Sequence, residues 1–157
     1  MRIGTGIDVH ALVESRTLTI GGVVVPHDRG LAGHSDADVL LHAIGDAILG
    51  ALTLGDLGAH FPATQEWKDA DSRTLLRHVF SLASARGYAV GNVDATVMAQ
   101  APKLAPYVDV MRANIAADLQ CGVAQISVKA TTTDRLGFIG RGEGMACLAT
   151  VLIVGRV

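Results

Sequence analysis

The chain has 157 residues and a formal net charge of −2, and half of its residues are hydrophobic whereas only 18% are charged. The apolar content excludes disorder, the absence of a basic excess argues against nucleic-acid binding, and no apolar stretch is long and uninterrupted enough for a membrane span of about 20 residues. With so few charged residues, the chain has more apolar surface than the core of one small subunit can bury, and we expect the remaining apolar surface to lie in an oligomer interface.

The elements predicted along the chain begin with a strand at 3–13 and a hairpin at 18–25, because Gly21-Gly22 is a strong two-residue turn signal. A helix is expected to begin at Ser35, which resembles a capping-box residue, and to end near Leu54. Beyond it we expect an irregular segment at 55–68, helices at 72–86 and 107–119, and strands at 88–100, 126–131 and 145–154, with 26–33 as a loop.

These elements predict an α+β fold. The four strands outside the hairpin are expected to form one mixed four-stranded sheet, and the helices are expected to cover it as the second layer of a two-layer sandwich. No linker interrupts residues 1–157, which predicts a single domain. The first residues contain no apolar signal segment, and the two cysteines are isolated in the sequence. These two features predict a cytoplasmic protein with reduced thiols.

Three residues suggest a metal site. Asp8 and His10 are two positions apart in the first strand, so their side chains leave the same face. His42 lies in an apolar helix with Asp38 and Asp46 one turn to either side. Two imidazoles and a carboxylate fill three corners of a tetrahedral zinc site and leave the fourth open, with Asp46 placed to orient His42. A solvated, hydrogen-bonded helix face remains the alternative.

Several further polar segments are candidates for binding an anion. The run 34–36 lies at an expected helix N-terminus, which favours an anion, although the residues alone favour an ordinary cap over an anion site. The run 131–134 ends a strand with three hydroxyls and a carboxylate, although threonine is also a good strand residue. Arg141 lies in a glycine-rich turn, where it either binds a phosphate or is solvated. Lys103 is a lone cation in a loop after Pro102.

Taken together, the motifs identify a family. In order they are Gly4-x-Gly6-x-Asp8-Val9-His10, His34-Ser35-Asp36-Ala37-Asp38, Leu54-Gly55-Asp56-Leu57-Gly58, Ala70-Asp71-Ser72-Arg73, Asn92-Val93-Asp94, Ala99-Gln100-Ala101-Pro102-Lys103, Lys129-Ala130-Thr131-Thr132-Thr133 and Gly140-Arg141-Gly142-Glu143-Gly144. The series resembles the 2-C-methyl-D-erythritol 2,4-cyclodiphosphate synthases of the non-mevalonate isoprenoid pathway. The resemblance extends from Arg2 to the last strand.

The resemblance implies a phosphorus–oxygen lyase. It converts 4-diphosphocytidyl-2-C-methyl-D-erythritol 2-phosphate to the 2,4-cyclodiphosphate and releases CMP, as the 2-phosphate attacks the β-phosphorus of the same molecule. Asp8, His10 and His42 match the family's zinc ligands. Asp134 matches the carboxylate that holds a second divalent cation, Mg²⁺ or Mn²⁺.

The resemblance also implies roles for residues around the substrate. His34 and Thr132 match the residues that stabilise the transition state, and Ser35 assists with the phosphate. The implied substrate-binding residues are Asp8, His10, His34, Ser35, Asp56, Leu57, Gly58, Phe61, Ala99, Gln100, Ala101, Pro102, Lys103, Leu104, Ala105, Thr131, Thr132, Thr133, Asp134, Phe138 and Arg141.

The family assembles as homotrimers whose sheets pack around a three-fold axis, with each active site between two subunits. We therefore expect strand faces that contain residues such as Val93, Val97, Leu148 and Val151 to surround that axis. In some members a prenyl diphosphate binds on the axis, and Arg141 matches the arginine implicated there.

The chain departs from the family pattern at two places. The segment Phe61–Gln65 lacks both aspartates of the usual Phe-x-Asp-Thr-Asp, so their substrate contacts are not carried over. Asp134 replaces the usual glutamate and is one methylene shorter, which favours a weaker or water-mediated contact with the second metal.

Two other functions compete with the synthase. One is a metal-dependent phosphohydrolase that attacks with a zinc-bound water and uses Asp38 or Asp46 as its base. The other is a trimeric binding protein with a purely structural metal, which would need a fourth protein ligand of no obvious spacing here.

Overall fold

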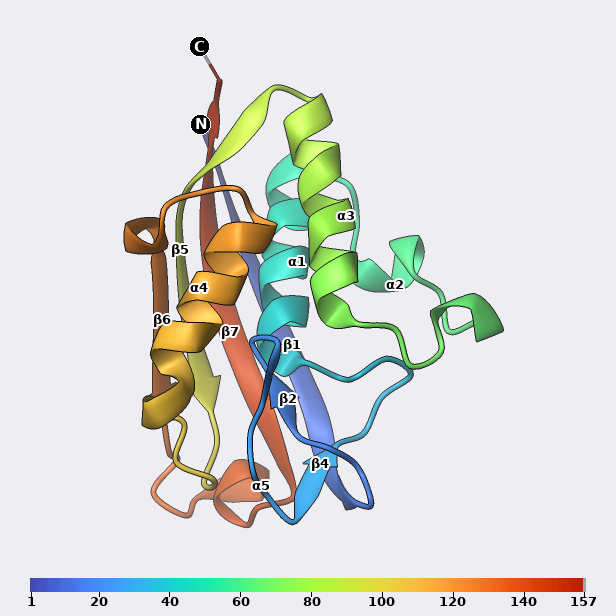
Figure 1. The fold of residues 1–157 in the computed structure, drawn as a ribbon, viewed down its shortest axis with the longest axis vertical. Helices are drawn as coiled ribbons and strands as arrows, with labels where there is room; N and C mark the ends of the chain where they lie inside the picture. Colours follow the sequence, from blue (N-terminus) through green and yellow to red (C-terminus); the bar gives the residue numbers. More distant parts are fainter. Residues whose placement is uncertain (157) are drawn as a thin grey trace.

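One mixed sheet forms the back of the molecule in the computed structural model, which describes residues 1–156 (Figure 1). Its strands are β1 (Arg2–Glu14), β4 (Arg29–Leu31), β5 (Tyr88–Met98), β6 (Ile126–Thr131) and β7 (Gly144–Gly155), whereas β2 (Thr19–Ile20) and β3 (Val23–Val24) form a separate hairpin. The sheet order is β4-β1-β7-β5-β6, with β5 and β6 parallel and the other neighbours antiparallel. The predicted mixed sheet is confirmed, with β4 as a fifth strand inside the segment expected to be a loop.

Three long helices cover one face of this sheet (Figure 1). They are α1 (Val39–Leu52), α3 (Ser72–Ala85) and α4 (Val108–Asp118); the shorter helices are α2 (Leu57–His60) and α5 (Gly137–Gly140), with 3₁₀ turns at Gln65–Trp67, Ala105–Tyr107 and Val123–Gln125. The predicted α+β, two-layer arrangement is confirmed. Among the described residues no helix is both long and apolar enough to cross a membrane.

Helix α1 starts later than the sequence predicted, because Asp38 rather than Ser35 is its cap. The Asp38 carboxylate accepts hydrogen bonds from the backbone N–H groups of Leu40 and Leu41 at 3.2 and 3.1 Å. It also accepts from Gly21 and Gly22 in the β2–β3 turn at 2.9 and 2.7 Å. One fully buried carboxylate therefore satisfies four backbone donors and ties the hairpin to the helix.

Helix α1 packs directly on β1 because two glycines leave room for it. A Cβ atom on Gly4 would lie 1.8 Å from the carbonyl oxygen of Ala47, and one on Gly6 would lie 2.1 Å from that of Ala43. Real Cβ atoms do not approach backbone so closely. The glycines thus allow helix and strand backbones to touch.

The two faces of the sheet differ from the sequence expectation. Val93, Val97 and Val151 are buried under the helices, so they do not face an axis outside the subunit. The opposite face instead exposes Leu148 and, from β1, Ile3, Ile7 and Val9. Period-two alternation groups residues correctly by face, but it does not say which face the helices cover.

We expect Asp38→Ala to lower the free energy of unfolding by about 3 kcal/mol or more, because it removes a helix cap and leaves the buried donor of Gly21 and the half-buried donor of Gly22 unpaired. The matched control is Asp71→Ala, which removes the exposed cap of α3 with its single bond to Arg73 and should cost about 1 kcal/mol. Urea unfolding of both variants measures the difference. Equal losses would show that the hairpin bonds contribute nothing.

Candidate metal centre and substrate cavities

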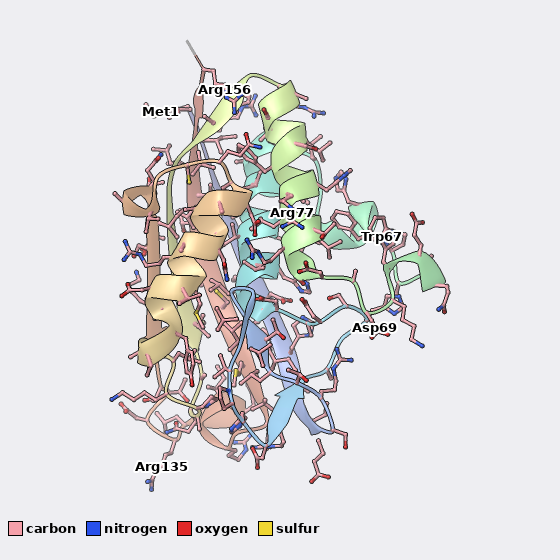
Figure 2. All side chains as sticks on the ribbon, in the orientation of Figure 1. Met1, Trp67, Asp69, Arg77, Arg135 and Arg156 are labelled. Carbon is pink, nitrogen blue, oxygen red and sulfur yellow. The ribbon has the colours of Figure 1, made fainter. Side chains whose placement is uncertain are left out.

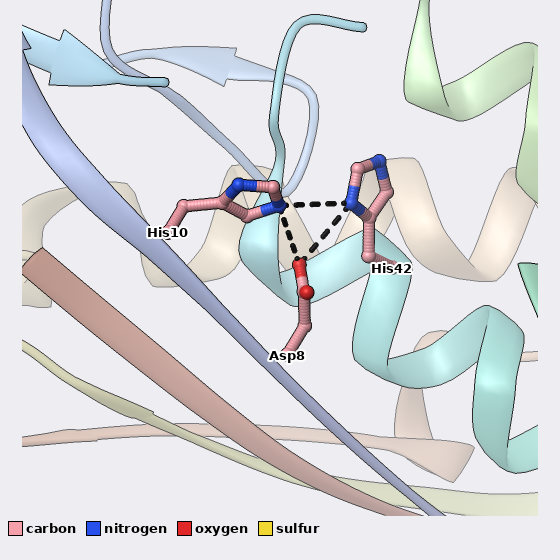
Figure 3. Close-up of side chains that lie close together, drawn as sticks. All are labelled: Asp8, His10 and His42. Atoms are coloured by element: carbon pink, nitrogen blue, oxygen red, sulfur yellow. Dashed lines mark hydrogen bonds and ion pairs between the residues drawn. The ribbon is translucent and has the colours of Figure 1, made fainter. Parts of the chain in front are cut away.

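Asp8, His10 and His42 meet at one point, as Figure 3 shows. The Nε2 atom of His10 lies 2.9 Å from Asp8 Oδ2, the Nδ1 atom of His42 lies 3.1 Å from the same oxygen, and the two nitrogens are 3.3 Å apart. Two of these residues come from β1 and the third from α1. The predicted cluster is confirmed as a geometric unit.

The glycines explain why the three side chains converge. Gly4, Gly6, Asp8 and His10 alternate along β1 and therefore share the face that α1 covers. Gly4 and Gly6 let α1 pack closely against β1. Asp8 and His10 follow them on the same strand face, beyond the point of closest packing. His42 precedes the turn of α1 that touches Gly6, so its ring reaches Asp8.

The donor set fits a zinc ion. Zinc bonds to histidine nitrogen and carboxylate oxygen are about 2.0–2.1 Å long, which puts neighbouring ligand atoms of a tetrahedron about 3.3 Å apart. The three distances of 2.9–3.3 Å in the triad are close to that separation. Within residues 1–156 the cluster has no fourth His, Cys, Asp or Glu, so one coordination position is left for a ligand.

The electrostatics of the triad favour a cation. Burial raises the pKa of the Asp8 carboxyl, but the adjacent rings of His10 and His42 outweigh it and hold that pKa well below its usual range. Burial lowers the pKa of His10, and the hydrogen bond and charge of Asp8 outweigh this and raise it. The half-buried carboxylate is thus ionised, as a metal ligand must be.

The hydrogen-bond partners of the two rings correct one prediction. His10 donates from Nδ1 to the carbonyl of Ala32 at 2.6 Å, and Nε2 of His42 lies 2.9 Å from Ser72 Oγ. Asp46, which was expected to orient His42, instead accepts a hydrogen bond from the backbone N–H of Leu57 at 2.8 Å. Ser72 lies in the 70–73 motif of the family resemblance, but no role follows for it from the sequence alone.

A cavity of 190 Å³ opens beside the triad. It is lined by His10, His34, Ser35, His42, Leu57, Gly58, Phe61, Trp67 and Leu75. Seven of these residues were predicted site residues, whereas Trp67 and Leu75 were missed. Trp67 packs edge-on against Phe61, with ring centres 4.9 Å apart. An aromatic residue in the irregular segment was the signal that would have pointed to it.

A second cavity, of 280 Å³, contains most of the remaining predicted residues. It is lined by Ala99, Gln100, Pro102, Lys103, Leu104, Ala105, Ala130, Thr131 and Thr132. Asp134 is exposed and accepts a hydrogen bond from the Thr132 hydroxyl at 3.4 Å. Phe138 lines a separate hollow with Thr133, and Arg141 forms an exposed ion pair with Glu143 at 2.7 Å.

The two cavities are far apart in one subunit. Thr131 pairs with Met98, Met98 with Ala146, and Ala146 with Val9. Three strand spacings therefore separate Thr131 from the strand that carries Asp8 and His10, which is roughly 14 Å. In Figure 2, Trp67 of the first cavity and Arg135, which follows β6, lie on opposite sides of the molecule. A single subunit thus holds two separate cavities.

Comparison with known proteins decides the family, because a model described as the YgbB family matches residues 1–154. The chain belongs to the YgbB family. Curated relatives named 2-C-methyl-D-erythritol 2,4-cyclodiphosphate synthase include one from Geobacter metallireducens, 65% identical over 99% of this chain and 100% of its own length. Another, from Salinibacter ruber, is 63% identical over 98% of each. The chain is thus an enzyme of this family, and the sequence resemblance is confirmed.

Solved structures agree with the YgbB family assignment. A CDP complex of IspF from Plasmodium falciparum superimposes with a TM-score of 0.88 at 37% identity, covering 99% of this chain and 97% of that one. The bifunctional IspDF from Campylobacter jejuni has a TM-score of 0.93 at 46% identity over 97% of this chain. This chain spans 42% of that bifunctional protein.

We expect Gly6→Ala to destabilise the fold by about 2 kcal/mol or more and to weaken binding of added zinc, because the new methyl group would push α1 away from β1. The control is Gly50→Ala in the same helix, where the nearest atom is Thr5 O at 3.9 Å and helix propensity favours alanine by up to about 1 kcal/mol. Urea unfolding and zinc titration measure both effects. A Gly6→Ala variant as stable as the unmodified chain would contradict this packing argument.

Proposed function

We propose that the chain converts 4-diphosphocytidyl-2-C-methyl-D-erythritol 2-phosphate to 2-C-methyl-D-erythritol 2,4-cyclodiphosphate and CMP. The observation that carries the proposal is the Asp8–His10–His42 triad at the wall of a cavity, in a chain 65% identical to a curated synthase. In the reaction an oxygen of the 2-phosphate forms a bond to the β-phosphorus. The bond from that phosphorus to the CMP oxygen breaks, and its electron pair leaves with CMP.

The main difficulty of this reaction is electrostatic repulsion. Two phosphate anions about 4 Å apart repel by roughly 4 kcal/mol at an effective dielectric constant of 20. A chain with a net charge of −2 does not offset this with its overall field. We infer that Asp8, His10 and His42 hold Zn²⁺ and that Asp134 contributes to a second divalent site, for Mg²⁺ or Mn²⁺. Such ions, when bound, polarise phosphate oxygens and neutralise their charge.

The residues beside the triad orient the reacting phosphate. Ser35 Oγ accepts a hydrogen bond from the backbone N–H of Ala37 at 3.1 Å, which leaves its own proton available for a phosphate oxygen. In the structure, His34 donates from Nε2 to the carbonyl of Thr64 at 2.6 Å, on the rim of the site. In the proposed mechanism His34 and Thr132 stabilise the transition state, each by donating a hydrogen bond to developing negative charge.

Asp56 and its neighbours are proposed to hold the methylerythritol group. Asp56 caps α2 by accepting a hydrogen bond from Ala59 N at 2.9 Å, and Leu57 and Gly58 line the cavity beside the triad. The exposed carboxylate has a second oxygen free to accept from a sugar-like hydroxyl. This half of the site would bind the part of the substrate that carries the attacking 2-phosphate.

The second cavity is proposed to bind the cytidine and the diphosphate. It is lined by residues 99–100, 102–105 and 130–132. Backbone N–H and carbonyl groups and threonine hydroxyls, which these residues carry, suit recognition of a base and a phosphate. The structural likeness to a relative solved as a CDP complex supports this assignment.

We further propose a homotrimer in which each active site lies between two subunits. Two observations support it. Three strand spacings, roughly 14 Å, separate the strand that carries Asp8 and His10 from Thr131 of the second cavity. The β1 strand also exposes Ile3, Ile7 and Val9 on the face away from the helices. An interface between copies would cover that apolar face. Three further expectations stay predictions: a prenyl diphosphate bound on the three-fold axis with Arg141, a cytoplasmic location, and a single domain over 1–157.

The phosphohydrolase alternative is not favoured by the geometry. It needs a carboxylate that is free to act as a base beside the triad. Asp38 and Asp46 do not line the cavity beside the triad. The Asp38 carboxylate instead accepts four backbone hydrogen bonds at the cap of α1, and Asp46 is directed at the backbone N–H of Leu57. The structural-metal alternative needs a fourth protein ligand, and the cluster offers three within residues 1–156.

Phosphorus NMR of the chain with the cytidyl substrate, Zn²⁺ and Mg²⁺ tests the proposed function. We expect signals of a cyclic diphosphate and of CMP, whereas inorganic phosphate would indicate hydrolysis.

His42→Ala should abolish CMP release and lower bound zinc to less than a tenth, because it removes one of three ligands. The matched control is His27→Ala, which should retain both, since His27 lies in the loop before β4 and pairs with Asp28. Full zinc stoichiometry in His42→Ala would remove His42 from the ligand set.

Variants of Asp134 test the second cation. We expect Asp134→Ala to raise the Mg²⁺ concentration for half-maximal CMP release by about tenfold and to leave bound zinc unchanged, because Asp134 is not one of the three residues of the triad. Asp134→Glu, which restores the reach of the usual family residue, should lower that concentration or leave it unchanged. Identical Mg²⁺ dependence in Asp134→Ala and the unmodified chain would assign the second cation to another group.

A further inference from the structure

We propose that Ser72 and Asp36 are positioning residues that fix the ring of His42 through a hydrogen-bond relay. They lie outside the ligand set and outside the substrate residues described above. The proposal rests on the proposed function in one respect, namely that His42 binds a metal ion through Nδ1. It adds the reason that this nitrogen, rather than Nε2, is presented to the ion.

The relay is a chain of two hydrogen bonds. Nε2 of His42 lies 2.9 Å from Ser72 Oγ, and Ser72 Oγ forms a short hydrogen bond with Asp36 Oδ1. Asp36 is held in turn by two backbone donors, since its Oδ2 accepts from Ser72 N at 3.0 Å and its Oδ1 accepts from Asp38 N at 3.1 Å. These two backbone hydrogen bonds hold the Asp36 carboxylate in the position where it accepts the hydroxyl proton of Ser72.

The direction of each hydrogen bond follows from the donor inventory. An ionised carboxylate only accepts, so the single hydroxyl proton of Ser72 is donated to Asp36. Ser72 Oγ can then only accept from His42, which requires a proton on Nε2. A neutral His42 ring with a proton on Nε2 has its lone pair on Nδ1, and Nδ1 faces Asp8 at 3.1 Å. A lone pair that faces a carboxylate suits a cation shared between the two.

The two histidines of the triad are fixed in complementary ways. His10 donates from Nδ1 to the backbone carbonyl of Ala32, which leaves Nε2 for the metal. His42 donates from Nε2 to a side chain, which leaves Nδ1. A backbone carbonyl cannot be removed by substitution, but the Ser72 hydroxyl can, so the relay is the part of the site open to a direct test.

Two features separate the relay from ordinary helix capping. The cap of α3 is Asp71, which leaves the Ser72 side chain free of that role. Ser72 is only 1% exposed, so solvent water does not compete with its hydroxyl as the hydrogen-bond partner of His42. Ser35 Oγ also lies within 3.2 Å of His42 Nε2, but it belongs to the cavity wall and has no carboxylate partner to fix its proton.

The test compares Ser72→Ala with Ser81→Ala by zinc titration against a chromophoric chelator. Both changes remove a hydroxyl from α3, but the Ser81 hydroxyl is exposed and donates only to the carbonyl of His78. We expect the zinc dissociation constant to rise about tenfold in Ser72→Ala and to change less than twofold in Ser81→Ala, as is typical when an outer partner of a ligating histidine is lost. A change below twofold in folded Ser72→Ala would overturn the relay.

A second variant and a spectroscopic signature separate positioning from a general loss of structure. Asp36→Asn keeps the shape of the relay but weakens its final acceptor, so its zinc dissociation constant should also rise, by about threefold to tenfold. In ¹H–¹⁵N spectra of the zinc-loaded chain, the Nε2–H of His42 should be protected from exchange. In Ser72→Ala its exchange should be at least tenfold faster, with the other zinc-bound histidine unchanged. A Nε2–H that is equally protected in both proteins would overturn the relay.

The outcomes also distinguish the relay from the proposed function. If the unmodified chain binds zinc and Ser72→Ala binds it more weakly, but no CMP is released from the cytidyl substrate, the function is rejected and the relay stands. If the chain releases CMP while zinc affinity is the same in both proteins, the function stands and the relay is rejected. If the unmodified chain binds no zinc, His42 is not a ligand and the relay is rejected.

Discussion

The contact between the backbones of β1 and α1 is the constraint on which the rest of the structure depends. It exists because Gly4 and Gly6 have no side chains on the face that the helix covers. The same strand face continues into Asp8 and His10, so the alternation that makes room for the helix also aims two ligands at it. If side chains at positions 4 and 6 held α1 further from β1, His42 would be out of reach of Asp8. Packing and metal geometry are therefore one requirement here.

The segment 34–38 joins this contact to the rest of the molecule. Asp38 ties the start of α1 to the β2–β3 turn, and Asp36 ties it to the first residue of α3. Between them these two carboxylates use most of their accepting capacity on backbone N–H groups, which fixes the direction in which α1 leaves the loop. His34 and Ser35 lie on the same segment and so are placed against the triad by the bonds of their neighbours.

The parts of the site that follow from local periodicity could be predicted from the sequence. Asp8 and His10 share a strand face by alternation, and the long helix that carries His42 is evident from its apolar run. The parts that depend on tertiary partners could not be predicted. Asp38, rather than the predicted Ser35, caps α1 because the β2–β3 hairpin supplies two extra donors to its carboxylate. Asp46 accepts a hydrogen bond from Leu57 because α2 folds back on α1. Ser72 acquires its role only when α3 packs beside the triad.

The segment after α2 shows why the chain tolerates the loss of two family aspartates. The loop is held by the carbonyl of Thr64, which accepts from His34, and by the ring of Phe61, which packs edge-on against Trp67 at 4.9 Å and His78 at 5.4 Å. Ala63 and Gln65 are exposed and take no part in these contacts. Because backbone and aromatic contacts fix the loop, its course does not need carboxylates at 63 and 65. Removing two negative charges from the rim also lowers the repulsion that a polyphosphate substrate meets on entry.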